Sequence, residues 1–316
     1  MTLAPPDAIA LLGHWLHETG YRFITVTPAT HARVNARPDA GEARSLRDVF
    51  GWSRPFAATL LPANALGWLR EGGLLEERDG LLRSRVRFSS LDGQLYAHSA
   101  WPTADADAVF FGPDTYRFVA LIQDELRRQP LQPGGRILDI GCGAGPGGTA
   151  AALAARAAMP QLVLADINHR ALDFARANAK LAEVAQVSFA QGDLYNAVDG
   201  SFHLVVANPP YLVDAGARTY RHGGGPLGSG LSERIVAEGL PRLAPGGRLV
   251  LYTGVAMVEG MDPFLQAMQP LLQRTGWPWH YRELDPDVFA EELETAAYAH
   301  ADRIAVVALV IHRPPS

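Results

Sequence analysis

The segment RILDIGCGAGPGGT, residues 136–149, decides how this chain is expected to fold. Its apolar start predicts a short buried strand, and the glycines that follow predict a tight turn into a helix. Glycines in such a turn let the backbone approach a ligand, and the free amides of the next helix point toward that ligand. The segment therefore predicts a binding site at the carboxyl end of a strand in an α/β sheet.

The glycine spacing of this turn fits two ligand-binding patterns at once. The dinucleotide pattern G-x-G-x-x-G is formed by Gly143, Gly145 and Gly148. The pattern D-x-G-x-G-x-G is formed by Asp139, Gly141, Gly143 and Gly145, and it resembles that of the class I S-adenosylmethionine-dependent methyltransferases. A turn that binds nothing is a third interpretation, because a glycine pattern alone is a weak signal.

Acidic residues lie near the ends of three predicted strands, and two of them, Asp139 and Asp193, favour the methyltransferase interpretation. Asp166 ends the second strand, where its carboxylate can accept hydrogen bonds from ribose hydroxyls under either pattern. Asp139 would repel a pyrophosphate but attract the ammonium group of a methionine. Asp193 follows the third strand in the run GDLY, where this superfamily usually carries an acidic residue near the adenine amino group. The predicted cofactor site also includes their neighbours Ile167 and Leu194.

The motif Asn208-Pro209-Pro210-Tyr211 follows a fourth apolar strand and is the most specific in the chain. It resembles the motif of methyltransferases that act on planar nitrogens, such as base amino groups or the side-chain amide of glutamine. Such a nitrogen is a poor nucleophile because its lone pair is delocalised. If the Asn208 side chain and the Pro209 carbonyl accept its N–H bonds, electron density can build toward an incoming methyl group. Tyr211 is predicted to offer a flat face for stacking, and simple packing is the alternative.

Beyond residue 106 the pattern alternates between strands and helices, which predicts a parallel sheet with helical crossovers. We therefore expect an α/β fold in which residues 106–316 form a Rossmann-like, seven-stranded methyltransferase sheet. The predicted strands are residues 137–140, 162–167, 187–190, 202–207, 248–253, 279–284 and 303–312.

Residues 1–105 are expected to form a smaller N-terminal α+β domain, winged-helix-like, that recognises the substrate. Apolar spacing predicts helices before a small sheet, and Asp79-Gly80 and Asp92-Gly93 predict tight turns between its strands. Residues 83–88 alternate as a half-buried strand does. Residues 1–110 carry eleven arginines and twelve acidic residues, which argues against a strong phosphate-binding field.

Composition narrows the class of protein further. With 48% hydrophobic and 19% charged residues the chain can build a packed core, and its net charge of -5 gives no general attraction to nucleic acid. Cys142 is the one cysteine, so an internal disulfide is impossible, and a cytoplasmic location is expected. Within its glycine turn Cys142 is predicted to fill space. No signal peptide, membrane span or metal site is predicted.

Together these motifs resemble those of the HemK-type glutamine methyltransferases, which modify peptide release factors. The resemblance covers about residues 108–316 and includes Phe111-Gly-Pro-Asp-Thr115 and Tyr220-Arg221-His222-Gly223-Gly224. It implies an S-adenosyl-L-methionine site formed by Thr115, Asp139, Gly141, Gly143, Gly145, Asp166, Ile167, Asp193, Leu194 and Asn208. It also implies Asn208, Pro209 and Tyr211 as the catalytic residues.

The expected function is methyl transfer from S-adenosylmethionine to a protein glutamine amide, with a peptide release factor as the partner. N-methylation of a base in ribosomal or transfer RNA, or of a small molecule, stays open. An RNA substrate would need a basic rim, for which Arg218 and Arg221 are the nearby candidates in sequence. A module that only senses S-adenosylmethionine would have no use for the acceptor motif, and a nicotinamide oxidoreductase would leave Asp139 and Asp193 unexplained. The sequence does not determine the oligomeric state.

Overall fold

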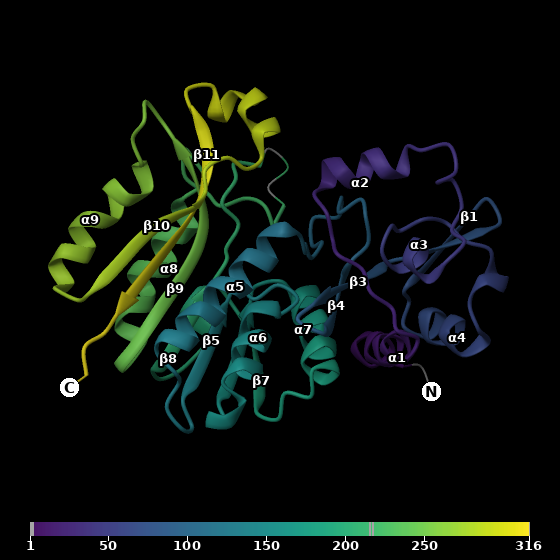
Figure 1. Cartoon of the computed structure of the whole chain (residues 1–316), viewed down its shortest axis with the longest axis horizontal. Coiled ribbons are helices and arrows are strands. Elements are labelled where there is room, and N and C mark those ends of the chain that lie inside the picture. The colour runs from purple at the N-terminus through teal and green to yellow at the C-terminus, as the bar shows by residue number, and fades with distance from the viewer. Residues whose placement is uncertain (1–2, 215, 217, 316) are drawn as a thin grey trace.

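Seven strands form one sheet in the order β10-β11-β9-β8-β5-β6-β7 (Figure 1). The computed structural model describes residues 3–214, 216 and 218–315. The strands are β5 (Arg136–Ile140), β6 (Gln161–Asp166), β7 (Val187–Gln191), β8 (Phe202–Ala207), β9 (Leu243–Met257), β10 (Trp279–Asp285) and β11 (Arg303–His312). Strands β5 to β9 pair in parallel, whereas β11 pairs antiparallel with both β9 and β10. The predicted Rossmann-like, seven-stranded sheet is confirmed.

Helices cover both faces of this sheet (Figure 1). Side chains alternate along β5, so Ile137 and Leu138 belong to different apolar clusters on opposite faces. One cluster joins the sheet to α5 (Pro113–Arg128), α6 (Pro146–Ala154) and α7 (His169–Leu181). The other joins it to α8 (Gly230–Gly239) and α9 (Pro263–Thr275). Burial on both faces explains why these strands are continuous apolar runs in the sequence.

The register of the central strands brings the predicted site together. Ile140, the last residue of β5, pairs with Ala165 of β6 on one side and with Ala207 of β8 on the other. The glycine turn, Asp166 and Asn208 each follow one of these residues directly along the chain. Three segments distant in sequence therefore end at one edge of the sheet, as expected for ligand sites in open parallel sheets.

The front of the chain contains helices followed by hairpins. These elements are α1 (Pro5–Glu18), α2 (Pro28–Asn35), α3 (Leu46–Phe50), α4 (Ala63–Glu71), β1 (Leu75–Arg78), β2 (Leu81–Ser84), β3 (Val86–Leu91) and β4 (Gln94–Ser99). The strands form two separate two-stranded sheets, β1-β2 and β3-β4, where one small sheet was expected. The predicted strand over residues 83–88 is interrupted at Arg85, whose N–H donates to the carbonyl of Leu74.

Helix α7 links the front region to the sheet. Its buried Asn178 uses Oδ1 to accept from the N–H of Ala97 at 2.7 Å, and its Nδ2 donates to the carbonyls of Ala97 and Ala144. One amide thereby joins β4 to the glycine turn.

A domain boundary near residue 105 stays a prediction. Across the described residues, no helix has both the length and the apolar character needed to cross a membrane.

Candidate functional site

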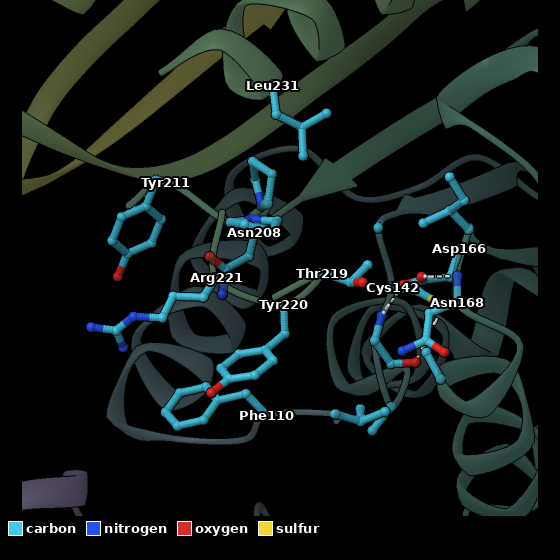
Figure 2. A pocket seen from close by; sticks show the side chains of 18 of the residues that line it. Phe110, Cys142, Asp166, Asn168, Asn208, Tyr211, Thr219, Tyr220, Arg221 and Leu231 are labelled. Atoms are coloured by element: carbon cyan, nitrogen blue, oxygen red, sulfur yellow. Dashed lines mark hydrogen bonds between the residues drawn. The ribbon is translucent and has the colours of Figure 1, made fainter. Parts of the chain in front are cut away.

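A pocket opens at the carboxyl ends of the central strands (Figure 2). Its lining includes these residues of the predicted site: Thr115, Asp139, Gly141, Gly143, Asp166, Ile167, Asp193, Leu194, Asn208, Pro209 and Tyr211. Gly145 is not among the described lining residues, because it lies behind the turn as the N-cap of α6, with a φ of 77°. The individual roles of these residues in binding and catalysis remain predictions.

The backbone of the glycine turn adopts φ angles that are unfavourable for residues other than glycine. The φ angle is 67° at Gly141 and 54° at Gly143, in the left-handed region that glycine adopts readily. A Cβ at Gly141 would meet no other atom within 4 Å, so glycine is required there by backbone conformation rather than by crowding. The N–H groups of Gly141 and Cys142 both donate to the carbonyl of Ala165, which fixes the turn against β6.

Asp166 connects this turn to the end of β6. Its Oδ2 accepts from the N–H of Gly143 at 2.8 Å, and its Oδ1 accepts from the N–H of Asn168 at 2.8 Å. A carboxylate oxygen has more than one lone pair, so both oxygens can still accept from a ligand. Burial raises the pKa of Asp166, although these backbone donors oppose that shift. The side chain of Ile167 beside it is 56% exposed and offers an apolar surface at the pocket rim.

Asp139 lies at the base of the pocket, between β5 and α6. It is only 1% exposed, and its Oδ2 accepts from the N–H of Gly148 at 2.7 Å. Burial raises the pKa of Asp139 to about 7, and the nearby charge of Asp166 adds to the shift. Among the described residues no lysine or arginine pairs with Asp139, and a bound cation would stabilise its ionised form.

Two further predicted residues follow β7. Asp193 forms an ion pair with Arg234 of α8, with an Nη2–Oδ2 distance of 2.9 Å. Leu194 is buried and has a φ of 47°, an uncommon conformation for a residue other than glycine. Such strained backbone gathers at ligand sites, where the surrounding structure holds it in place.

Thr115 and Cys142 complete the wall near α5. The Thr115 Oγ1 accepts from the N–H of Gly112 at 3.3 Å and so caps the helix. Cys142 is buried, and burial raises the pKa of its thiol well above the usual value. Since the thiolate is the nucleophilic form, this agrees with the predicted space-filling role.

The acceptor motif occupies the other side of the pocket. In Figure 2, Asn208 lies between Tyr211 and Asp166. Asn208 lines the pocket, and within the described residues its side-chain amide makes no hydrogen bond, so the amide is available to a ligand. Tyr211 is 8% exposed and meets the ring of Phe289 edge-on, with centroids 6.0 Å apart. Its proposed stacking against a substrate stays a prediction.

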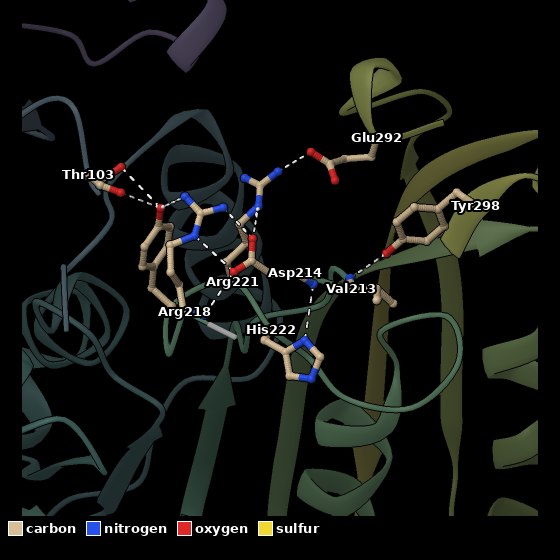
Figure 3. A network of polar contacts seen from close by, with 9 residues as sticks. Thr103, Val213, Asp214, Arg218, Arg221, His222, Glu292 and Tyr298 are labelled. Atoms are coloured by element: carbon tan, nitrogen blue, oxygen red, sulfur yellow. Dashed lines mark hydrogen bonds and ion pairs between the residues drawn. The ribbon is translucent and has the colours of Figure 1, made fainter. Parts of the chain in front are cut away.

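The segment after the motif forms a wall built from polar contacts (Figure 3). Asp214 accepts from Arg218 Nε at 3.0 Å and pairs with Arg221 at 3.4 Å, and Arg221 also pairs with Glu292. The hydrogen bonds from Arg218 lower the pKa of Asp214 to about 2. These contacts pair both arginines with carboxylates, so the basic rim that an RNA substrate would need is largely neutralised here.

This wall is also attached to the segment that follows the front hairpins. The hydroxyl of Tyr220 donates to the carbonyl of Thr103 at 2.8 Å, and its ring stacks on Phe110 at 5.8 Å between centroids. His222 is exposed, and its Nδ1 accepts from the N–H of Asp214 at 3.2 Å. His222 is not among the described residues that line the pocket.

Comparison with known proteins agrees with this geometry. A sequence profile described as the methyltransferase small domain matches residues 119–268. The chain is 36% identical over 222 residues to a release factor glutamine methyltransferase of Deinococcus radiodurans, an alignment that covers 66% of this chain and 73% of that relative. The chain belongs to the HemK-type methyltransferase family.

Two further similarities extend over more of this HemK-type chain. A release factor glutamine methyltransferase of Yersinia pestis is 29% identical over 276 residues, which are 84% of this chain and 91% of the relative. The solved structure of a proposed transferase from Pyrococcus horikoshii has a TM-score of 0.51, with 13% identity, over 80% of this chain and 83% of its own. That structural similarity shows a shared fold alone. As a family member, the chain is an S-adenosylmethionine-dependent methyltransferase.

The pocket of this HemK-type enzyme fits that cofactor. S-adenosylmethionine carries a sulfonium, an ammonium group, ribose hydroxyls and an adenine amino group, all of which favour acidic or accepting partners. The lining supplies Asp139, Asp166 and Asp193, which lie in or just after the ends of β5, β6 and β7, together with the apolar Ile167. Asp139 is a buried carboxyl that no lysine or arginine of the described residues pairs with, and a cofactor ammonium group would supply that partner.

Several lining residues were not singled out from the sequence. They are Pro28, Phe110, Asp114, Phe118, Leu231 and Phe289. Asp114 lies inside residues 111–115, a segment that carried the family resemblance, so that segment could have revealed it. Pro28 and Phe289 reach the pocket from opposite ends of the chain, and no local pattern indicates their position.

Proposed function

We propose that this enzyme methylates the side-chain amide nitrogen of a glutamine in a protein, and that the protein is a peptide release factor. The relatives from Deinococcus radiodurans and Yersinia pestis carry that activity in their names, and the chain retains the acceptor motif Asn208-Pro209-Pro210-Tyr211. A glutamine amide is planar and weakly nucleophilic, and this motif is suited to such a nitrogen.

One observation carries the proposal: the Asn208 amide, unpaired among the described residues, lines the same pocket as Asp139 and Asp166. Methyl transfer requires the acceptor nitrogen and the donor methyl to approach each other in line, within a few ångströms. A motif elsewhere on the surface could not meet that requirement. The register of β5 and β8 brings the predicted cofactor site and the acceptor motif to one edge of the sheet.

The proposed mechanism divides the work among few residues. Bound S-adenosylmethionine supplies a methyl group on a positively charged sulfur. Asp139 would bind the ammonium end of the cofactor, Asp166 its ribose hydroxyls and Asp193 its adenine amino group. The Asn208 side-chain oxygen and the Pro209 carbonyl would accept the two amide N–H bonds and direct the nitrogen lone pair toward the methyl group. The nitrogen becomes acidic as it is alkylated, so a strong general base is not needed, and orientation supplies much of the acceleration.

The same proposal assigns substrate recognition to residues 1–105. Pro28, at the start of α2, lines the pocket, so the front region reaches the site. Its nearly equal numbers of arginines and acidic residues suit a protein partner better than a polyanion.

A labelling experiment tests the proposal. The enzyme is incubated with radiolabelled S-adenosylmethionine and a lysate that is then separated into protein, RNA and small-molecule fractions. We expect label in protein, and peptide mass spectrometry should locate the methyl group on a release-factor glutamine. Label in RNA or in a small molecule would overturn the proposed acceptor, and an Asn208→Ala variant provides the background.

A further inference from the structure

Asp114, in the first turn of α5, joins two distant tyrosines through its carboxylate. Its Oδ2 accepts from the hydroxyl of Tyr211 at 2.7 Å, and its Oδ1 accepts from the hydroxyl of Tyr252 on β9 at 2.8 Å. The three side chains are buried, with Asp114 7% exposed. One carboxylate therefore connects the acceptor motif to a helix and to the neighbouring strand.

The ring of Tyr211 is confined as well as its hydroxyl. A Cβ placed on Gly254 would lie 2.3 Å from the Tyr211 ring, so this ring fits against β9 only because residue 254 is a glycine. Gly254 and Tyr252 are two apart along β9 and thus face the same side of the sheet. Phe289 meets the ring from a third direction. Tyr211 consequently has one position in which its ring and its hydroxyl are both accommodated.

We propose that Asp114 is a positioning residue for methyl transfer, which acts by holding Tyr211 so that Asn208 and the Pro209 carbonyl keep the direction needed to bind the acceptor amide. This inference rests on the proposed acceptor role of Asn208 and Pro209. The connection is mechanical: only Pro209 and Pro210 separate Asn208 from Tyr211, and proline locks its φ angle. A shift of Tyr211 is therefore transmitted to the motif rather than absorbed by free torsions.

The surroundings of Asp114 support a fixed acceptor. Arg117 donates to Asp114 Oδ1 at 3.2 Å and pairs with Asp285 of β10 at 2.8 Å, which supplies a cation beside the carboxylate. Burial raises the pKa of both Tyr211 and Tyr252, so both hydroxyls stay protonated and able to donate. Asp114 also lines the pocket, and binding of the cofactor by its carboxylate is the competing role that an experiment must separate.

The test is a double-mutant cycle on kcat with Asp114→Ala, Tyr211→Phe and the combined variant. Tyr211→Phe keeps the ring and removes only the hydroxyl that Asp114 binds. We expect each single change to lower kcat by roughly 10- to 100-fold, as small misplacements in an active site do. The combined variant should be no slower than the slower single variant, because both changes break one link. The dissociation constant of S-adenosylhomocysteine should change by less than about twofold.

Tyr281→Phe is the matched control, since Tyr281 also donates its hydroxyl to a carboxylate, that of Asp262, but neither residue is among the described pocket lining. Its kcat should equal that of the wild type. Three results would each overturn the inference. They are additive losses of kcat in the combined variant, a wild-type kcat in Tyr211→Phe, and an effect confined to cofactor affinity. If the melting curve shows that Asp114→Ala does not fold, the kcat values of Tyr252→Phe and Tyr211→Phe still test the inference. A wild-type enzyme that labels no glutamine refutes the proposed function instead, so the two failures are distinguishable.

Discussion

Oδ2 of Asp166 accepts a hydrogen bond from the backbone N–H of Gly143 at 2.8 Å, across 23 residues of chain. This one contact ties the end of β6 to the glycine turn after β5. The carboxylate that is predicted to bind the ribose thus also shapes the loop that is predicted to bind the rest of the cofactor.

Replacing Asp166 with alanine should therefore damage the cofactor site twice. The substitution removes a ribose acceptor and leaves the N–H of Gly143 without its partner. We expect the dissociation constant of S-adenosylhomocysteine, measured by titration calorimetry, to rise about 10- to 100-fold, the range for lost hydrogen bonds to a charged group. Asp124→Ala is the control. It removes a carboxylate on α5 that pairs with Arg127 and is not among the described pocket lining, so the dissociation constant should not change. An unaltered affinity in Asp166→Ala would contradict the assignment.

Cofactor affinity should depend on pH through Asp139. Burial raises the pKa of this carboxyl to about 7 in the free protein, and an ammonium group binds its ionised form. Below that pKa a proton must leave on binding, so affinity should weaken as pH falls, by up to about tenfold per pH unit, and level off above it. Binding of S-adenosylhomocysteine from about pH 5.5 to about pH 8.5 measures this. Asp139→Asn should bind weakly without that slope, and a flat wild-type profile would count against the role.

Asn208→Ala should separate chemistry from cofactor binding. The variant loses an acceptor for the substrate N–H, so we expect kcat to fall by about 100-fold or more. The affinity for S-adenosylhomocysteine should change by no more than about twofold, because Asn208 is predicted to act mainly on the acceptor. Asn64→Ala, an exposed asparagine on α4, is the control for general effects. If only the cofactor affinity fell and kcat stayed the same, Asn208 would bind the cofactor rather than the acceptor nitrogen, which would contradict the prediction.

Cys142 should resist thiol reagents in the folded enzyme. It is buried, and burial raises the pKa of its thiol, so little thiolate is present near neutral pH. We expect iodoacetamide to react at least about tenfold more slowly with the native protein than with the same chain in urea, which exposes this single cysteine. Mass spectrometry gives both rates. Rapid labelling of the native enzyme would instead indicate an accessible, activated thiol.

Much of the sheet could be predicted because its strands are apolar runs bounded by turn residues. The predicted strand over residues 202–207 coincides with β8, and the one over 303–312 coincides with β11. Strand β9 is the exception, since it begins at Leu243 rather than Arg248. Its Pro-Gly-Gly sequence at residues 245–247 predicts a turn, but the strand continues there because its register with β8 shifts between Phe202 and Leu204.

The lining of the pocket was most readily predicted where its residues lie at strand ends. Asp166 and Asn208 are such residues, and the parallel register brings them together. The contacts of Asp114 could not be predicted, because they join residues 97 and 138 positions apart and depend on how α5 packs against β9. The contacts of Tyr211 could not be predicted either. Its residue type suggests a stacking surface, whereas the structure shows a buried side chain whose contacts hold it in place.

The contacts of Tyr220 with Thr103 and Phe110 bear on how such enzymes could be recombined. A chimaera that exchanged the front region at residue 105 would separate Thr103 from Phe110 and divide the surface on which Tyr220 rests. A graft that carries residues 103–110 together, with an aromatic partner kept at position 220, preserves that junction. The exchangeable unit is therefore larger than the N-terminal helices and hairpins alone.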